Sequence, residues 1–156
     1  DTLLPKTQST LNTQKKLSAN TIYAFEWTSK GYCYSTKSKL YLYLGNFCYC
    51  HQSLLIPRKI YYSCRYEISG DHELLLRALK IGYTIKHIHS PLANYAGGGI
   101  SSKRKIRKLI EKLKISILYV PLYMIPITIT YNLLTGLGAQ RILKFLEPLE
   151  RRRINA

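Results

Sequence analysis

Residues 71–89 contain the pattern that most restricts the fold of this chain of 156 residues. Between residues 71 and 81 apolar side chains recur every three or four positions, as they do on one face of a helix. Gly82 is the expected end of that helix, since glycine readily adopts the left-handed backbone that closes helices. Residues 83–89, YTIKHIH, then alternate as in a β-strand. A helix, a glycine and a strand in this order predict an α/β fold.

Shorter runs predict the other elements. Residues 20–27 are rich in strand formers, residues 28–31 read as a turn, and residues 32–35 are the expected second arm of a hairpin. The remaining expected elements are a helix or strand at 39–44, a buried strand at 47–57 ended by Pro57, a basic and aromatic connection at 58–66, a basic helix at 103–114 and a basic helical stretch from 141 to Pro148.

The chain is strongly basic, with 24 Lys and Arg against 8 Asp and Glu and a net charge of +16. Such an excess attracts polyanions, namely nucleic acid, anionic lipid or phosphorylated ligands. Much of the positive charge lies in residues 103–114, KRKIRKLIEKLK, and in RRR at 151–153.

The four cysteines stand at positions 33, 48, 50 and 64. Cys48 and Cys50 are one residue apart and no second pair follows, whereas structural zinc sites take ligands two to four residues apart in two pairs. In a strand both thiols would face the same side. We therefore expect buried free thiols rather than a metal site, which points to a reducing compartment.

Asp71 and Glu73 open the helix at 71–81. The N-terminal end of a helix favours an ionised carboxylate, and an Asp held there can act as a general base towards a hydroxyl. A purely structural reading is also open. Asp71 would then be an ordinary helix cap, and Glu73 would pair with Arg77 one turn later.

Other polar groups allow two interpretations each. The glycine-rich loop GGGISS, with Gly97, Gly98, Gly99 and Ser101, could form an anion-binding nest for a diphosphate or serve as a flexible linker. His51, at the end of the expected strand, reads as a core or rim histidine. His87 and His89 share one face of a strand, but no carboxylate or Cys lies near them in sequence, so a structural role is favoured over metal binding.

Residues 115–140 carry no charge and follow the basic helix directly. A membrane-crossing helix needs roughly 20 predominantly apolar residues, but two prolines and several polar residues interrupt this run. A basic amphipathic helix beside an apolar run suits an anionic membrane surface, with interfacial insertion favoured over a span. Packing of this tail on another part of the protein is the alternative.

The motifs CHQSLLIPRKIY, YEISGDHELLLRALKIGYTIKHIHSPLANYAGGGISS and their order resemble the C-terminal half of a family-2 glycosyltransferase with the GT-A fold, over about residues 45–102. The resemblance implies that Asp71 is the catalytic base that deprotonates the acceptor hydroxyl. It implies that Glu73 orients the acceptor or pairs with Arg77. It places His51, Gln52 and the loop with Gly97, Gly98, Gly99 and Ser101 near the donor sugar and its phosphates.

The opening residues DTLLPKT resemble the segment that follows the family's Asp-x-Asp motif. Asp1 would then be the last acid of that motif and would hold a divalent cation, Mg²⁺ or Mn²⁺, against the nucleotide diphosphate. On this interpretation the nucleotide-binding strands lie upstream and the chain is a fragment of the enzyme.

We therefore expect residues 1–102 to be the C-terminal part of a GT-A, Rossmann-like mixed sheet, and residues 103–156 a basic, hydrophobic, membrane-associated helical tail. The expected activity is transfer of a sugar, with inversion, from a nucleotide-sugar donor to a lipid-linked or polysaccharide acceptor. The expected location is the cytoplasmic, inner face of the cell membrane, peripheral or single-span, without a nucleic-acid partner. The alternatives are a non-catalytic basic module that binds nucleic acid or anionic membrane, and a small structural membrane protein.

Overall fold

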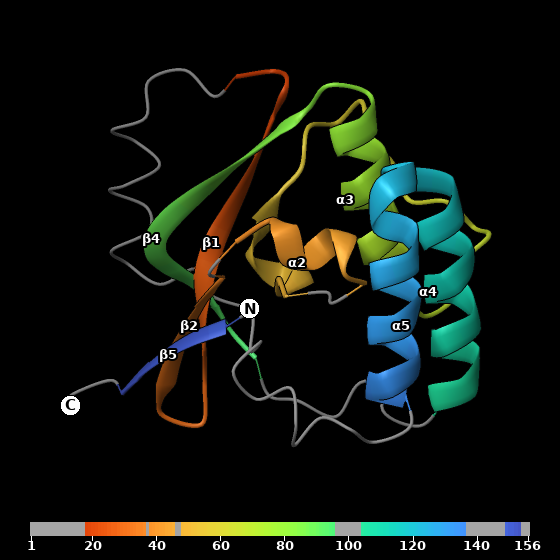
Figure 1. Ribbon diagram of the computed structural model, residues 1–156. Helices are drawn as coiled ribbons and strands as arrows, with labels where there is room; N and C mark the ends of the chain where they lie inside the picture. The colour runs from red at the N-terminus through yellow and green to blue at the C-terminus, as the bar shows by residue number, and fades with distance from the viewer. Residues whose placement is uncertain (1–17, 37, 46–47, 96–103, 137–148, 154–156) are drawn as a thin grey trace.

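The structure, a computed structural model, describes residues 18–36, 38–45, 48–95, 104–136 and 149–153. A five-stranded sheet lies on one side of the molecule, and the described helices pack against one of its faces (Figure 1). The mixed α/β class expected from the sequence is confirmed.

The sheet is built around the strand β1. Strand β4 runs parallel to β1 along one edge, whereas β2 and β3 share the opposite edge and are antiparallel to it. Strand β5 extends the sheet by antiparallel pairing with β2. The strands are β1 (Thr21–Ser29), β2 (Tyr32–Thr36), β3 (Leu54–Leu55), β4 (Thr84–Asn94) and β5 (Leu149–Arg153).

Strand β1 is buried on both of its faces, which makes it the centre of the fold. Ile22 and Ala24 point into the larger hydrophobic core, which the helices cover. Tyr23 and Phe25, one position out of phase, join a smaller cluster with β4 on the other face. This is the two-residue period of a strand between two apolar layers.

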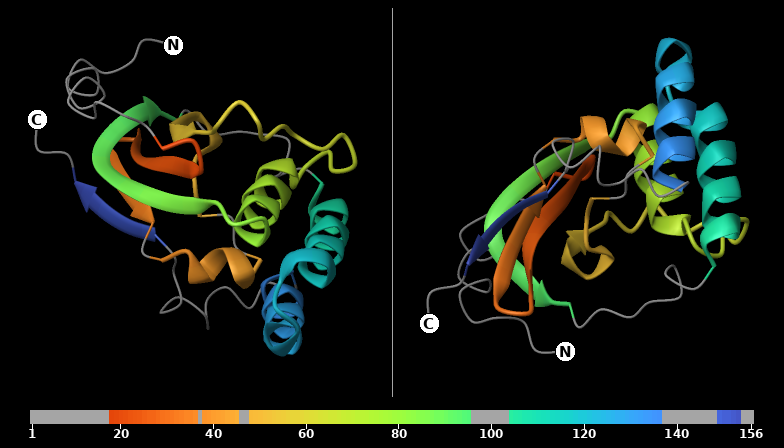
Figure 2. Two further views of the ribbon diagram at one scale, coloured as in Figure 1. Left: turned by 90° about the horizontal axis from the view of Figure 1, so that it is seen from above. Right: turned by 60° about the horizontal axis from the view of Figure 1, so that its bottom comes forward.

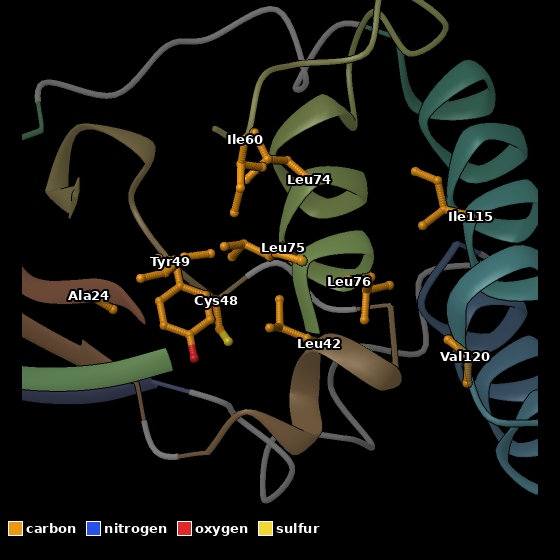
Figure 3. Close-up of a cluster of buried hydrophobic side chains, with 12 residues drawn as sticks. Ala24, Leu42, Cys48, Tyr49, Ile60, Leu74, Leu75, Leu76, Ile115 and Val120 are labelled. Atoms are coloured by element: carbon orange, nitrogen blue, oxygen red, sulfur yellow. The ribbon is translucent and has the colours of Figure 1, made fainter. Parts of the chain in front are cut away.

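The helices form two layers on the covered face. Helices α2 and α3 lie between the sheet and a hairpin of α4 and α5 (Figures 1 and 2). Leu42, Leu74 and Leu75 from the inner layer and Ile115 from α4 are fully buried in one cluster (Figure 3). The bounds are α2 (Leu40–Tyr43), α3 (Gly70–Lys80), α4 (Lys105–Tyr119) and α5 (Ile125–Gly136), with 3₁₀ turns η1 (His51–Ser53) and η3 (Leu122–Met124).

The predicted helix–glycine–strand unit is confirmed by α3 and β4, which are joined through Gly82 at a φ of 93°. Strand β4 extends further than expected. Its register with β1 shifts where Glu26 pairs with Pro91, because proline has no N–H to donate to a ladder. The predicted hairpin of β1 and β2 is also confirmed, with its turn at Lys30 and Gly31.

The prediction of a buried strand at residues 47–57 is wrong for the part that the structure describes. Residues 51–53 form the turn η1, and only Leu54–Leu55 pair with β1. The physical reason is that β2 already occupies the other end of the same edge of β1. Cys48 and Cys50 are nevertheless buried free thiols, as expected, and burial raises the pKa of Cys48 to about 12.

The ambiguous run at 39–44 is helical, as α2. The basic helix predicted at 103–114 is present as α4 and continues into the uncharged run to Tyr119, after which Pro121 separates it from α5. No helix within the described ranges has both the length and the apolar character that crossing a bilayer requires. The predicted helix from 141 to Pro148 lies outside the described residues, and the strand β5 that follows it was not predicted.

Candidate functional site

Asp71 lies in the first turn of α3 and is half-buried, so the residue is partly exposed to solvent. The pKa shifts of Tyr62 and Cys50 show that both side chains lie near the Asp71 carboxylate. Burial raises the pKa of Tyr62, and a hydrogen bond to the Asp71 carboxylate and the charge of that group raise it further. Burial likewise raises the pKa of the Cys50 thiol, and the Asp71 charge adds to that shift. The Asp71 carboxylate therefore accepts a hydrogen bond from the Tyr62 hydroxyl and lies close to Cys50.

Cys50 immediately precedes the turn η1, which carries His51 and Gln52. Both side chains are exposed, while Ser53 at the end of the turn is buried. The fold thus brings the predicted site residues His51 and Gln52 to the same region as Asp71, although about 20 residues separate them in sequence. Tyr62 was missed by sequence reasoning, and its only signal was its place in the aromatic connection before the helix.

Glu73 is 1% exposed, and its carboxylate accepts hydrogen bonds from other side chains of the protein. Nε of Arg77 donates to Oε1 of Glu73 at 2.8 Å, and the hydroxyl of Tyr119 donates to the same oxygen at 2.9 Å. Arg77 also donates to the carbonyl of Tyr61 at 2.6 Å. The predicted ion pair of Glu73 and Arg77 is confirmed. A role of either residue in binding the acceptor stays a prediction.

Glu111, on α4, holds the segment that leads into α3. Its carboxylate accepts hydrogen bonds from the backbone N–H groups of Glu67, Ile68 and Ser69, at 3.1, 3.0 and 2.8 Å. Ser69 is the cap residue of α3 but makes no side-chain capping bond. Glu111 therefore positions the N-terminal end of the helix that carries Asp71.

The charge state of Glu111 follows from these contacts. Burial raises the pKa of Glu111, but the three N–H donors and Arg107 outweigh burial, so the pKa is lowered overall. Arg107 also pairs with Glu67 at 2.8 Å, and Arg104 pairs with the same carboxylate. Sequence reasoning missed this role; the available signal was that Glu111 is the single acid in the basic helix at 103–114.

His72 follows Asp71 but faces the interior, where it is 1% exposed. Its Nε2 lies 2.8 Å from the carbonyl oxygen of Leu42, at the middle of α2. Burial lowers the pKa of His72 to about 4, and Lys112 and Lys108 on α4 add to the shift. A neutral imidazole therefore donates from Nε2 and joins α3 to α2.

The sheet brings together polar groups that are distant in sequence. Nδ1 of His89 lies 3.2 Å from Oε1 of the buried Glu26, and the Cys33 thiol donates to Oε2 at 3.3 Å. His87 lies 3.4 Å from the Tyr49 hydroxyl, and burial lowers its pKa. A small hollow between β1, β2 and β4 borders this cluster. Within the described ranges, no three His, Cys, Asp or Glu side chains are grouped so that they could hold a metal ion.

Several predicted site residues lie outside the described residues. They are the expected cation ligand Asp1 and the members of the glycine-rich loop, Gly97, Gly98, Gly99 and Ser101. The described part of the candidate site consists of Asp71, its partner Tyr62, the exposed pair His51 and Gln52, and the supporting carboxylates Glu73 and Glu111. Comparison with known proteins found no matching family model, no matching curated protein and no matching solved structure.

Proposed function

We propose that this chain is the acceptor-activating part of a glycosyltransferase that resembles family 2, with Asp71 as the catalytic base. The observation that carries the proposal is a partly exposed Asp in the first turn of a helix whose entry is held by Glu111. A general base must be held rigidly within reach of the hydroxyl that it deprotonates. The neighbouring exposed His51 and Gln52 supply hydrogen-bonding groups for a sugar or phosphate.

The proposed reaction is a single displacement. The Asp71 carboxylate takes the proton of an acceptor hydroxyl, whose oxygen forms a bond to the anomeric carbon of the donor sugar. The bond from that carbon to the nucleotide diphosphate breaks on the opposite side, and the diphosphate leaves with the electron pair. One base and one displacement invert the anomeric configuration.

The resemblance also implies a divalent cation at the diphosphate, which stays a prediction. The described residues offer no group of ligands for it, and Asp1 lies outside them, so we derive no step through Mg²⁺ or Mn²⁺. The GT-A identity and a Rossmann-like sheet also belong to this proposal. The parallel pairing of β4 with β1, reached through α3, supports them.

The proposed acceptor is lipid-linked or a polysaccharide, and the proposed location is the cytoplasmic, inner face of the cell membrane. Nucleotide sugars are charged and water-soluble, whereas a lipid-linked acceptor stays in the bilayer, so the enzyme must work where the two meet. The net charge of +16 supports contact with anionic lipid.

The test compares Asp71→Asn with the unchanged protein at its full natural length. Release of nucleotide from a panel of nucleotide sugars is measured with membrane extract as acceptor source, in the presence of Mg²⁺, Mn²⁺ or a chelator. Loss of a general base is expected to lower kcat by about 10²- to 10⁴-fold with a smaller change in KM. The matched control, Glu67→Gln, neutralises an exposed acid on the same segment and should keep its activity.

Full activity of Asp71→Asn would remove Asp71 as the base. Absence of nucleotide release from every donor by the unchanged protein would contradict the transferase itself. A non-catalytic basic module is the second candidate, because Arg104, Lys105 and Arg107 are exposed on one helix. Tight DNA binding that weakens steeply with salt would favour that module.

A further inference from the structure

The turn between α4 and α5 leaves an unusual group of large hydrophobic side chains exposed. Leu122 is 84% exposed and Tyr123 is 80% exposed, so both side chains extend almost fully into solvent. Other exposed apolar side chains surround them at the ends of the two helices. We call the following set the apolar tip: Ile81, Ile117, Leu118, Leu122, Tyr123 and Ile127.

Ile81 belongs to this set because the C-terminal end of α3 lies at the same end of the molecule (Figure 1). Nζ of Lys80 donates to the carbonyl of Leu118 at 2.7 Å and lies 5.6 Å from the centre of the Tyr119 ring. The apolar tip is therefore formed by two chain segments that are distant in sequence, and no single sequence window contains it.

The apolar tip is held rigidly from beneath. Ile115 and Val120, which flank Ile117 and Leu118 of the tip in sequence, are buried in the main hydrophobic core. The Tyr119 hydroxyl binds the buried Glu73. On the far side, Thr128 of α5 donates to the carbonyl of Tyr43 at 2.7 Å. One face of the hairpin is thus bound to the protein, while the apolar tip is presented outward and is not covered by any part of the chain that the structure describes.

The charges near the apolar tip are positive. Residues 115–140 contain no charged side chain, Lys114 is exposed just before them, and Lys80 lies beside Leu118. None of the acids in the described ranges belongs to the tip, and Glu111 on α4 and Glu73, which binds Tyr119 of α4, are buried and paired. Exposed apolar and aromatic side chains bordered by lysines match the interface of an anionic bilayer, where lysine binds headgroups and apolar side chains enter the acyl boundary.

We propose that the apolar tip inserts into the interfacial layer of a membrane that contains anionic lipid. The inference deepens the proposed location of the enzyme and rests on the proposed function only for its purpose, which is access to a lipid-linked acceptor. Residues 117–127 of the tip lie in the uncharged run for which interfacial insertion was expected, whereas the basic helix at 103–114 has an apolar stripe of its own, formed by Ile106, Leu109, Ile110 and Leu113. In the structure Leu109 and Leu113 are half-buried, so that stripe is not presented as a continuous face.

The test measures co-sedimentation of the full chain with vesicles of phosphatidylcholine, alone or mixed with phosphatidylglycerol. The variant Leu122→Ser/Tyr123→Ser removes the two most exposed side chains of the tip, neither of which contributes to the core. It is expected to weaken binding to the mixed vesicles by about tenfold or more. The matched control is Ile106→Ser, which changes a side chain that is 77% exposed at the other end of α4 and should change binding by less than about twofold.

If the double variant binds vesicles as tightly as the wild type, the proposal is overturned. An equal loss of vesicle binding in Ile106→Ser would also overturn it, because α4 would then lie flat on the membrane. Equal binding to both kinds of vesicle would overturn the choice of an anionic bilayer.

A second measurement is the fluorescence of Tyr123→Trp. The emission of the new tryptophan should shift to the blue with vesicles and be quenched by brominated acyl chains, whereas the signal of the buried Trp27 should stay constant. An unchanged spectrum would also overturn insertion. These measurements need no sugar donor, so their failure is distinct from failure of the transferase assay.

Discussion

Two buried titratable side chains, His72 and Glu111, join the elements around the candidate site, and each does so in one protonation state. His72 is neutral and binds the carbonyl of Leu42. Glu111 is ionised and binds three consecutive backbone N–H groups. Both pKa values are lowered, but from different starting points, so the two residues affect stability in different pH ranges.

His72 should make stability fall as the solution becomes mildly acidic. Its pKa is about 4 in the folded protein and near 6.5 when unfolded, so its contribution is complete above pH 6.5 and is lost between pH 6.5 and 4. The loss is on the order of 3 kcal/mol. Urea unfolding of His72→Gln, which keeps an N–H donor, should show a flatter pH dependence over this range. The exposed His51→Gln is the control and should follow the wild type; an unchanged slope in His72→Gln would contradict the assignment.

Glu111 should act at lower pH. Because its folded pKa is below its ordinary value of 4.5, its stabilising contribution is present above that value and is lost as pH falls through the folded pKa. Glu111→Gln should lower the free energy of unfolding at pH 7 by about 1–3 kcal/mol, and the difference from wild type should shrink in strong acid. The exposed Glu67→Gln should cost less than about 1 kcal/mol. Equal stabilities of Glu111→Gln and wild type at pH 7 would refute this role.

At the scale of elements, α5 is attached to the end of α2 through polar contacts that were not predicted from its sequence. Asn132, 1% exposed, donates to the carbonyls of Leu44 and Thr128. Its side chain lies directly against Gly45, whose φ of 76° is in the left-handed region. A side chain at position 45 would collide with Asn132, so this glycine is required by close approach as well as by conformation.

Gly45→Ala should therefore destabilise the protein more than a left-handed backbone alone explains. Gly31 is the matched control, because its φ is 79° and nothing lies within 4 Å of an added Cβ. Gly31→Ala should cost about 1 kcal/mol, and Gly45→Ala about 1–3 kcal/mol more, measured by urea unfolding. Equal costs at the two positions would show that α5 does not press on Gly45.

Local patterns predicted the elements whose stability is decided within a few residues. The strand formers at 20–27, the glycine turn before residue 32 and the period of α3 were sufficient for the hairpin and the helix–glycine–strand unit. The strand prediction at 47–57 failed because a strand needs a free edge, and β2 already occupies one end of the available edge of β1. The apolar character of a segment alone does not show whether another strand already occupies the edge with which it would pair.

At the scale of the whole molecule, α4 is part of the main core. Ile115 is 0% exposed and joins the cluster that contains Ala24 of β1 and Leu74 of α3 (Figure 3). Tyr119 and Glu111 add polar contacts to α3 and to its entry. The division of the chain at residue 102 stays a prediction, and the energetic share of α4 in the fold can be measured directly.

Ile115→Ala should lower the free energy of unfolding by about 2–4 kcal/mol, because it leaves a cavity between α3 and α4. Ile117→Ala, on the same helix but 60% exposed, should change it by less than about 0.5 kcal/mol. Thermal or urea unfolding followed by circular dichroism measures both. A neutral Ile115→Ala would mean that the hairpin of α4 and α5 folds apart from the sheet.

The candidate site was predictable in part. The sequence singled out Asp71 and the Glu73–Arg77 pair, since helix ends and i,i+4 spacing are local features. It did not identify Tyr62 as a partner of Asp71 or Glu111 as the support of the helix entry. The contact of Glu111 with Ser69 crosses 42 residues, and it depends on how α4 packs against α3.

By itself the sequence determined the α/β class, the place of Asp71 at a helix end and the positive charge, because period, capping preference and composition act over short distances or over the whole chain at once. The tertiary structure alone decided which acids are partly exposed and which are buried, that His89 meets Glu26, and that Lys80 at the end of α3 meets Leu118 of the apolar tip. Those outcomes depend on which surfaces the packed elements cover, and packing joins segments whose separation along the chain leaves no local pattern.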